Sequence, residues 1–305
     1  MSIPLYPDFA PLDLEAGGDL HPRLSLTADG VSEFTFSGLY LFRNRYRYRV
    51  AKAPGEGFIV SGEQPTEGHP SPGGDSGGGK KFFMTPCASP GPEILAALFE
   101  THDYWKNIGD SVLAPEKENL TRLGIEIAED RDNFDYLYLR SDLAELAGKK
   151  FHKKKNLVNA FHKSCPNHDV RPLTAELIPQ AMEVLDRWRA DKGGEGDYRA
   201  AREALELFGS LKLRGSIFFV DGAPAGWCLG ESIAKGKMFA IHFEKAVDGI
   251  KGIYQYMNQA FAASLPRFFT YLNREQDLGD EGLRQAKETY RPCGFVKKYR
   301  GIRHG

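Results

Sequence analysis

Five consecutive polar residues follow an apolar segment near the end of the chain. Residues 268–272 have the composition of a buried strand, and they lead directly into Asn273, Arg274, Glu275, Gln276 and Asp277. Polar side chains between a buried strand and a helix lie where α/β proteins hold ligands. We therefore expect substrate binding by Asn273, Arg274, Glu275 and Gln276, and a general-base role for Asp277. The alternative is an Asx turn with an Arg–Glu surface pair.

A second constellation, His242-Phe243-Glu244-Lys245, ends another predicted strand. Because side chains alternate along a strand, His242 and Glu244 lie on the same face. A histidine and a carboxylate on one face could form a general base and the partner that orients it, so both are candidate catalytic residues. The alternative is a solvated strand edge in which Glu244 and Lys245 are ordinary surface charges.

Two further segments could bind phosphate. In residues 248–252, glycines precede a predicted helix, so backbone N–H groups could face an anion while Lys251 adds charge. Residues 149–155 contain five lysines, and like charges this dense on one helix repel unless an anion offsets them. The phosphate-binding candidates are Lys153, Lys154, Lys155, Lys245, Lys251 and Gly252. The alternatives are a plain strand-to-helix turn and a solvated helix end, which cations also favour.

The basic tail offers another anion surface. Residues 287–305 include Arg291, Lys297, Lys298, Arg300 and Arg303 against a single acid, Glu288. Together with the lysine run, these cations could form one basic surface if the two halves of the chain pack face to face.

Composition limits the class of protein. The chain has 305 residues, of which 41% are apolar and 27% charged, and its 40 basic and 41 acidic residues give a net charge of −1. These values exclude a disordered chain and any global attraction to nucleic acid or anionic lipid. Four scattered cysteines indicate neither a zinc site nor a redox pair and fit the cytosol. We find no signal peptide or transmembrane segment and expect a cytoplasmic protein without a metal site.

The chain contains none of the P-loop, Rossmann, zincin or serine-hydrolase motifs. Transfer chemistry without a metal or a nucleotide fold is the class that remains.

The elements that must position these residues follow from periodicity. Alternation predicts two or three strands in residues 33–60, and the Gly/Pro/Ser-rich residues 61–79 predict a flexible insertion. A strand at 134–139 precedes one helix from Ser141 to about Phe161, and Pro166 ends that unit. Two helices, a three-stranded antiparallel meander, a helix, a strand, a helix and a final strand near 294–299 follow. This order is typical of a mixed-sheet α/β fold of the N-acyltransferase (GNAT) type, with a boundary near residue 165.

Several segments together resemble a known family. FHKKKNLVNAF (151–161), IHFEKA (241–246), KGIYQYMNQAF (251–261) and YLNREQDLGDEGLRQAKETYRP (271–292) are similar to soluble bacterial proteins related to the C-terminal catalytic domain of phosphatidylglycerol lysyltransferase. The resemblance implies two tandem GNAT-like domains, 1–165 and 166–305, with the acceptor in a cleft between them. It also implies that Tyr254, Gln255 and Tyr290 bind substrate. Membrane-bound relatives transfer an aminoacyl group from aminoacyl-tRNA to a lipid headgroup.

The sequence thus predicts an acyl- or aminoacyltransferase. An acceptor amine or hydroxyl, on a small molecule or a lipid headgroup, would attack the ester of aminoacyl-tRNA or the thioester of acyl-CoA, with Glu244 or Asp277 as base and His242 as an intermediary. No tightly bound cofactor is expected, and tRNA is a candidate partner. The alternative is a non-catalytic GNAT-like module that binds RNA or an acidic metabolite, and a third is a protein-binding surface.

Overall fold

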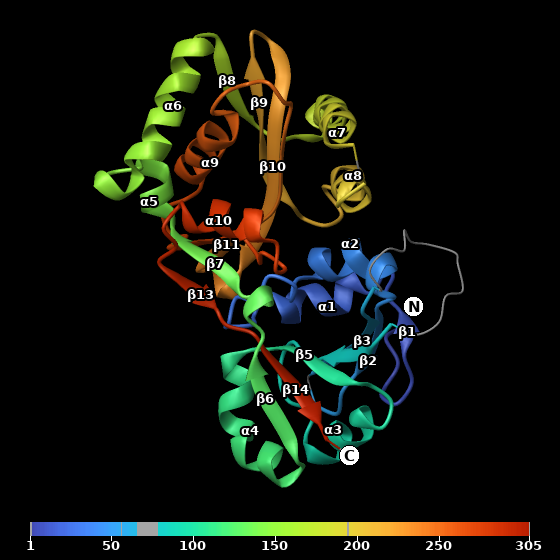
Figure 1. Ribbon diagram of the computed structural model, residues 1–305. Helices are drawn as coiled ribbons and strands as arrows, with labels where there is room; N and C mark the ends of the chain where they lie inside the picture. Colours follow the sequence, from blue (N-terminus) through green and yellow to red (C-terminus); the bar gives the residue numbers. More distant parts are fainter. Residues whose placement is uncertain (1, 56, 66–78, 194, 305) are drawn as a thin grey trace. The chain divides into compact units, whose positions relative to one another are not determined.

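The computed structural model describes residues 2–55, 57–65, 79–193 and 195–304. Contacts divide the chain into two units, residues 1–135 with 296–305 and residues 136–295. Each unit is built on one seven-stranded mixed sheet with helices against it (Figure 1). The predicted mixed α/β fold class is confirmed, and each of the two units holds one mixed sheet.

The first unit contains a sheet that is antiparallel except where β4 and β5 run parallel. Its apolar core joins the sheet residues Ile59, Phe83 and Trp105 to Leu95 and Leu98 of one helix. The strands, in spatial order, are β1 (Ala10–Pro11), β2 (Arg49–Lys52), β3 (Phe58–Glu63), β4 (Lys81–Met84), β5 (Tyr104–Ile108), β14 (Tyr299–Arg303) and β6 (Ile125–Glu129). The helices are α1 (Gly17–Leu24), α2 (Phe36–Tyr46), α3 (Pro92–Phe99) and α4 (Asp110–Arg122).

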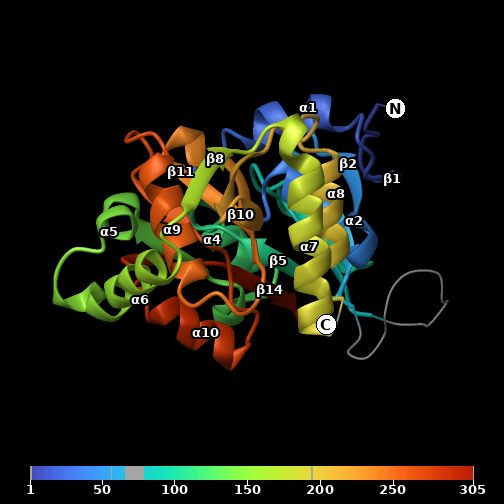
Figure 2. The ribbon, with the colours of Figure 1, turned by 90° about the horizontal axis from the view of Figure 1, so that it is seen from above.

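The second unit also contains a parallel pair, β11 and β12, beside an antiparallel meander. Helices α7 and α8 lie side by side on one face of its sheet, and α6 and α9 lie on the other (Figure 2). The strands, in spatial order, are β13 (Gly294–Val296), β7 (Asp135–Leu139), β12 (Tyr271–Asn273), β11 (Met238–Ala246), β10 (Ala223–Ile233), β9 (Arg214–Val220) and β8 (His168–Pro172). The helices are α5 (Arg140–Glu145), α6 (His152–Ser164), α7 (Ile178–Lys192), α8 (Tyr198–Glu206), α9 (Ile253–Ser264) and α10 (Glu281–Glu288).

Two strands cross between the sheets. β7 follows the first unit in the chain but lies between β12 and β13, and β14 follows the second unit but lies between β5 and β6. This exchange explains why the division falls after Asp135 and again at Val296 rather than near residue 165. The final strand predicted at 294–299 is accordingly two strands, β13 and β14, in different sheets.

The prediction of strands throughout residues 33–60 is wrong for its first half, which forms α2. The Thr35 hydroxyl caps this helix by accepting a hydrogen bond from the Gly38 backbone N–H at 2.9 Å. Phe36, Leu39 and Tyr40 are buried at helical spacing, so the period of the apolar residues, rather than their β-propensity, decides the structure. β2 and β3 form the second half as predicted.

Other boundaries also shift. The helix α3 ends at Phe99, and Trp105 lies in β5. The single helix expected from Ser141 to Phe161 is interrupted at Leu146. The backbone of Leu146 has the left-handed αL conformation, which ends α5, so α5 and α6 are separate helices. Residues 61–63 of the predicted insertion belong to β3, and residues 66–78 lie outside the described part of the chain. The predicted three-stranded antiparallel meander is confirmed as β9–β10–β11, and Asp280 caps α10 by accepting a hydrogen bond from the Leu283 backbone N–H.

A buried ion cluster joins the two crossing segments. Lys298, just before β14, contacts Asp135 at the start of β7 with Nζ 2.6 Å from Oδ1, and it also pairs with Glu33. The side chains of Lys298 and Asp135 are both fully buried. Ser32 donates two hydrogen bonds to the same Asp135 carboxylate, one from its backbone N–H and one from its hydroxyl, each 2.9 Å long.

We predict that Lys298→Met lowers the free energy of unfolding by about 3–5 kcal/mol, because it leaves the buried Asp135 carboxylate without its cation. The matched control is Lys297→Met, which removes only an exposed pair with Glu129 and should change stability little. Urea denaturation of both variants measures the difference. Equal losses of unfolding free energy in the two variants would show that the buried Lys298–Asp135 pair does not stabilise the crossing strands β7 and β14.

Candidate functional site

The candidate site lies where the parallel strands β11 and β12 separate. The two strands pair only at Met238–Tyr271, Phe239–Leu272 and Ala240–Asn273. β12 then ends, while β11 continues to Ala246. The polar residues of β11 beyond Ala240 and those that follow β12 therefore lie at one end of the parallel pair.

Arg274 and Glu244 form an ion pair at this point. The Arg274 Nη2 lies 2.5 Å from the Glu244 Oε2, and each side chain is 16% exposed. Burial disfavours the charge of Arg274, but the Glu244 carboxylate outweighs it and raises the pKa of the guanidinium. Arg274 is therefore a permanent cation. It lies directly after β12, the strand that the sequence places before it.

Lys154 adds a second cation from α6. Its Nζ lies 3.9 Å from the centre of the Tyr290 ring, and the Arg274 guanidinium lies 4.9 Å from the same centre. Burial, together with the charge of Arg274, lowers the pKa of Lys154 from 10.5 to about 8. Within the described residues Lys154 has no carboxylate partner. We call Lys154, Arg274, Glu244 and Tyr290 the cationic cluster.

Two nitrogens of Arg274 have no acceptor. Its Nε and Nη1 are buried without an acceptor in hydrogen-bonding geometry among the described residues, although the nearby Tyr290 hydroxyl interacts with the guanidinium. A buried donor without an acceptor costs about 1–3 kcal/mol, so proteins rarely leave one without a reason. The cationic cluster therefore has the electrostatics of an anion-binding site.

His242 does not fit the predicted role of general base. The register of β10 against β11 shifts at Leu229 and Gly230, so His242 lies in a bulge. Its Nε2 is 3.0 Å from the Glu231 Oε1, and its Nδ1 is 2.7 Å from the Glu275 Oε1. Burial disfavours the charged ring, but the two carboxylates outweigh it and raise the pKa of His242 to about 10. The ring is therefore a charged link between two acids, with neither nitrogen free to take a proton.

Asp277 is likewise unsuited to the predicted general-base role. It accepts hydrogen bonds from the Tyr136 hydroxyl at 2.7 Å, from Arg284 at 2.9 and 3.0 Å, and from the Gly279 backbone N–H at 2.9 Å. Burial by itself would raise the pKa of Asp277, but these donors hold it well below its usual range. Such a weak base, surrounded by donors, fixes the loop rather than moving protons.

The remaining loop residues also serve the backbone. The Asn273 Oδ1 accepts a hydrogen bond from the Glu275 backbone N–H at 2.8 Å, which is the Asx turn considered as an alternative. Lys287 donates to the carbonyl oxygens of Arg274 and Glu275. Glu275 has a positive φ of 57°, which this set of hydrogen bonds maintains. Gln276 lies partly buried in the same loop.

The structure separates the predicted phosphate-binding residues. Lys245 lies beneath Trp188 and pairs with Asp197 at 2.6 Å, and Lys251 is exposed before α9. At Gly252, a Cβ would lie 2.3 Å from the Leu157 carbonyl oxygen, so this glycine allows close packing of α6 on α9. Lys153 and Lys155 are exposed on α6, and Lys154 alone of the run joins Arg274.

The cations of the C-terminal tail are mostly paired. Lys297 pairs with Glu129, Arg300 with Asp130 and Arg303 with Glu100, in addition to the buried Lys298. The predicted basic surface is therefore largely neutralised by acids of the first unit.

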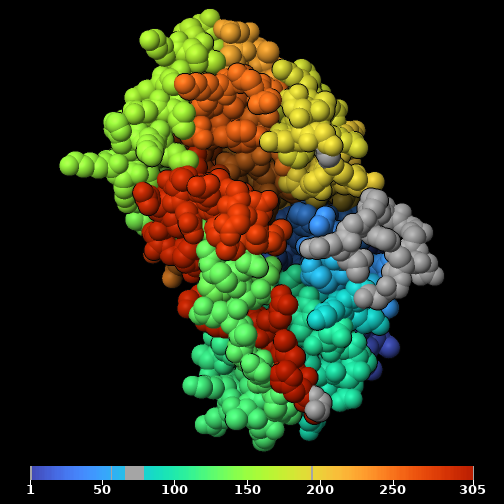
Figure 3. Space-filling view, in the orientation of Figure 1, coloured from blue at the N-terminus to red at the C-terminus, as the bar shows by residue number. Residues whose placement is uncertain are grey.

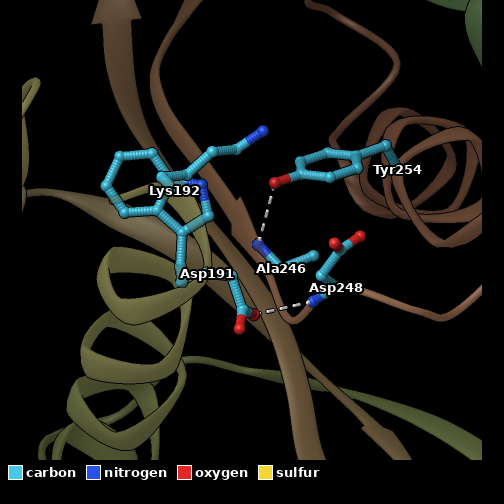
Figure 4. Close-up of a pocket in the computed structure, with 6 residues that line it drawn as sticks. Asp191, Lys192, Ala246, Asp248 and Tyr254 are labelled. Atoms are coloured by element: carbon cyan, nitrogen blue, oxygen red, sulfur yellow. Dashed lines mark hydrogen bonds between the residues drawn. The ribbon is translucent and has the colours of Figure 1, made fainter. Parts of the chain in front are cut away.

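A small pocket lies near the end of β11, between α7 and α9, where Figure 3 shows the surface hollowed between yellow and orange atoms. Figure 4 shows the Tyr254 hydroxyl accepting a hydrogen bond from the Ala246 backbone N–H at 3.3 Å. Asp191 similarly accepts one from the Asp248 backbone N–H at 3.3 Å. The residues that line the pocket are Trp188, Asp191, Lys192, Ala246, Asp248 and Tyr254.

Tyr254 therefore lines this pocket, whereas Tyr290 belongs to the cationic cluster. Gln255, the third residue assigned to substrate by resemblance, lies on α9. Its side chain forms a hydrogen bond with the Tyr290 hydroxyl, which acts to lower the pKa of that hydroxyl. The three residues thus divide between two places in the second unit.

The family model described as "Phosphatidylglycerol lysyltransferase, C-terminal" matches residues 24–301. The chain belongs to this family. The resemblance expected from the sequence is thereby confirmed over most of the chain.

Three solved structures are similar to this family member. A conserved protein of unknown function from Bacteroides thetaiotaomicron is 28% identical with a TM-score of 0.83, covering 97% of this chain and 99% of that one. The C-terminal domain of a putative lysylphosphatidylglycerol synthetase from Agrobacterium fabrum is 12% identical, with a TM-score of 0.63 and coverage of 96% and 93%. L-PGS from Bacillus licheniformis is 14% identical, with a TM-score of 0.61 and coverage of 99% and 94%.

A curated relative, an uncharacterized protein of Mycoplasmoides gallisepticum, is 24% identical over 172 residues. The match covers 54% of each chain, so this family member spans about half the length of that relative. Within the described residues, no helix combines the length and the apolar character needed to cross a bilayer. Among the same residues, no three or more His, Cys, Asp or Glu side chains are placed so that they could hold a metal ion.

Sequence reasoning missed several residues of the family member's site. Glu231, which pairs with His242 together with Glu275, lies inside β10. An acidic residue in an otherwise apolar strand is the sequence signal that could have identified it. Tyr136 and Tyr138 come from β7, which the sequence assigned to the other half of the chain. Arg284, which holds Asp277, is one α-helical turn after Asp280.

We predict that His242 makes stability depend on pH. Its folded pKa of about 10 exceeds its ordinary value of 6.5, so its stabilising contribution is complete below pH 6.5 and is lost as the pH rises towards 10. The free energy of unfolding should fall more steeply over this range for the native chain than for His242→Gln.

Urea denaturation at several pH values tests this expectation. The control is His304→Gln, because His304 is an exposed residue with a 70% exposed side chain that pairs with Glu126. Parallel pH profiles for the native chain and His242→Gln would contradict the assignment.

Proposed function

We propose that this chain is an aminoacyltransferase that moves an activated acyl group to an amine or hydroxyl acceptor. Membership in the phosphatidylglycerol lysyltransferase C-terminal family supports aminoacyl transfer in general. The names of the A. fabrum and B. licheniformis structures, which have the same fold, point the same way. The donor is aminoacyl-tRNA or acyl-CoA, and the acceptor is a small molecule or a lipid headgroup. We place the reaction in the cytoplasm, where both donors occur.

The observation that carries this proposal is the Arg274–Glu244 pair at the separation of β11 and β12. It brings a fixed cation and a carboxylate to the end of the parallel strands, where α/β folds hold ligands. The Glu244 Oε2 is bound to Arg274, while its Oε1 has no partner among the described residues. One oxygen of this carboxylate is therefore free to receive a proton.

In the proposed step, the acceptor oxygen or nitrogen attacks the carbonyl carbon of the donor ester or thioester. The Glu244 Oε1 takes the proton of the acceptor, and the bond from the carbonyl carbon to the leaving oxygen or sulfur breaks. The proton then passes from Glu244 to that leaving atom, so the carboxylate is regenerated. Arg274 holds the Glu244 carboxylate in place through its Oε2 and so leaves Oε1 for the proton.

This assignment replaces two of the three predicted catalytic residues. His242 holds Glu275 and Glu231 in place, and Asp277 anchors the loop through Arg284, so both are positioning residues. Glu244 alone keeps the general-base role that the sequence suggested.

A second candidate function is a non-catalytic module that binds an anionic ligand. The observation that favours it is the internal pairing of the 273–277 loop, in which Asn273, Glu275 and Asp277 all bind other parts of the second unit. Such a module would bind ligand through the cationic cluster without any turnover.

We predict that Glu244→Gln lowers the transfer rate about 10²-fold or more, the usual contribution of a general base, while donor affinity changes little. The measurement is transfer of a labelled aminoacyl group from aminoacyl-tRNA, and of a labelled acetyl group from acetyl-CoA, to a panel of amines and glycerol-based lipids. The matched control is Glu183→Gln, which removes an exposed carboxylate 3.9 Å from Arg187 on α7.

The results separate the two functions. An unchanged rate in a folded Glu244→Gln protein removes Glu244 from the mechanism. Binding of either donor without transfer by the native chain favours the module. Binding of aminoacyl-tRNA should weaken steeply between 50 and 200 mM salt, by ~10³ for about six phosphate contacts, and acetyl-CoA should compete only if it is the donor.

A further inference from the structure

The cationic cluster has more positive charge and more hydrogen-bond donors than its own residues satisfy. Lys154 and Arg274 lie against the same Tyr290 ring, with Glu244 as the one carboxylate in contact with either within the described residues. The Nε and Nη1 of Arg274 remain without acceptors. Two neighbouring cations repel each other, and burial strengthens that repulsion.

We propose that Lys154 and Arg274 form a receptor for one phosphate group of a substrate. An oxyanion between the two cations would accept hydrogen bonds from Nε or Nη1 of Arg274 and from the Lys154 ammonium, which removes both the repulsion and the unsatisfied donors. Arg274 follows β12 and Lys154 lies on α6, so the two cations approach the Tyr290 ring from different elements. A tetrahedral phosphate can present oxygens to both cations, whereas the two oxygens of a carboxylate lie in one plane.

The charge balance indicates a phosphate of low charge. Arg274 and Lys154 contribute two positive charges when both are protonated, and Glu244 removes one. A phosphodiester, which carries a single negative charge, would neutralise the cluster. Binding would also raise the pKa of Lys154 again, because the anion stabilises the charged amine.

Neighbouring lysines do not offer the same site. Lys150 pairs with Asp142 at 2.6 Å and Lys245 with Asp197 at 2.6 Å, so both already have carboxylates. Lys153 and Lys155 flank Lys154 on α6 but are exposed. The receptor therefore consists of Lys154 and Arg274 rather than the whole lysine run.

An anion can reach the cluster because it lies near the surface. The side chain of Arg274 is 16% exposed, and Lys154 is only partly buried. Lys154 contacts Tyr290 without an ion pair, so no carboxylate of the described residues competes with a bound anion for its ammonium group.

This inference rests on the proposed function only for the source of the phosphate. The 3′ end of a tRNA and a glycerophospholipid headgroup carry phosphodiesters, and coenzyme A carries a diphosphate and a phosphomonoester, so all three present phosphate oxygens. Direct binding therefore tests the receptor without any assay of transfer. If the phosphate receptor is disproved, the proposed aminoacyl transfer is unaffected, and the reverse also holds.

The first test is the rate at which acetic anhydride labels each lysine of the full chain, followed by mass spectrometry at pH 8. Saturating inorganic phosphate should slow labelling of Lys154 several-fold and leave Lys153 unchanged. Sodium acetate at the same ionic strength should protect Lys154 much less. Equal protection by acetate, or none by phosphate, would overturn the proposal.

Variants provide the second test. Lys154→Met keeps the Arg274–Glu244 pair, so it should fold, and Lys153→Met is the matched control on the same helix. Phosphate should raise the Tm of the native chain and of Lys153→Met, and the shift should be lost or strongly reduced in Lys154→Met. The same shift in all three proteins would show that phosphate binds elsewhere.

The source of the phosphate follows from competition. A short RNA ending in CCA, coenzyme A and glycerol 3-phosphate are each tested for protection of Lys154 against labelling. If the RNA protects, Lys154→Met should reduce the slope of log affinity against log salt by about 0.7, the value for one phosphate contact with a single strand. Each protecting compound supports the receptor and identifies its source, and protection by none of the three contradicts it.

Discussion

The buried contact between Lys298 and Asp135 holds together the two segments on which both sheets depend. Asp135 begins β7, which completes the second sheet, and Lys298 precedes β14, which completes the first. A charge pair with no exposure is stable only when each member keeps its partner, so the two crossing segments are fixed as one unit of structure. Tyr136 and Tyr138 come just after Asp135 in β7. The Tyr136 hydroxyl donates a hydrogen bond to Asp277, and Tyr138 packs against Tyr290.

Buried charges in the second unit divide into two groups with different purposes. His242, Glu231, Glu275, Asp277 and Arg284 are matched to one another, and together they set the path of the loop after β12. Arg274 and Lys154 are not fully matched, although they lie beside that same loop. A rigid, internally satisfied frame around an unsatisfied pair of cations is the arrangement that favours a preorganised ligand site, because little is left to reorganise when the ligand arrives.

The sequence predicted elements better than roles. The meander of β9 to β11 and the helix capped by Asp280 follow from alternation and capping, which are local signals. α2 was mistaken for strands because its aromatic residues have high β-propensity, whereas its cap at Thr35 and its buried face fix a helix. The division at Asp135 depends on pairing between strands more than 150 residues apart, such as β6 with β14, and no local pattern reports that.

The roles predicted for single residues are less certain for a related reason, because the sequence does not show which partners a polar side chain will have. Asp277 and His242 were sound candidates by type and position, but Arg284, Tyr136 and Glu231 occupy their lone pairs or protons. Among the six predicted phosphate-binding residues, the structure brings only Lys154 to the cationic cluster, because the helical period turns Lys153 and Lys155 outward.

The first unit shows that the fold by itself does not make the site. Its parallel pair, β4 and β5, also separates, after Phe83 and Trp105, and a lysine follows at Lys106. That lysine is buried 4.8 Å from the Phe82 ring centre and 5.1 Å from that of Tyr46, and burial lowers its pKa. Aromatic rings and the Gln64 side chain surround the amine there, where the second unit has an arginine–carboxylate pair. The same topology thus presents a covered cation in one unit and a charge pair with a free carboxylate oxygen in the other, and only the second arrangement can both hold an anion and accept a proton.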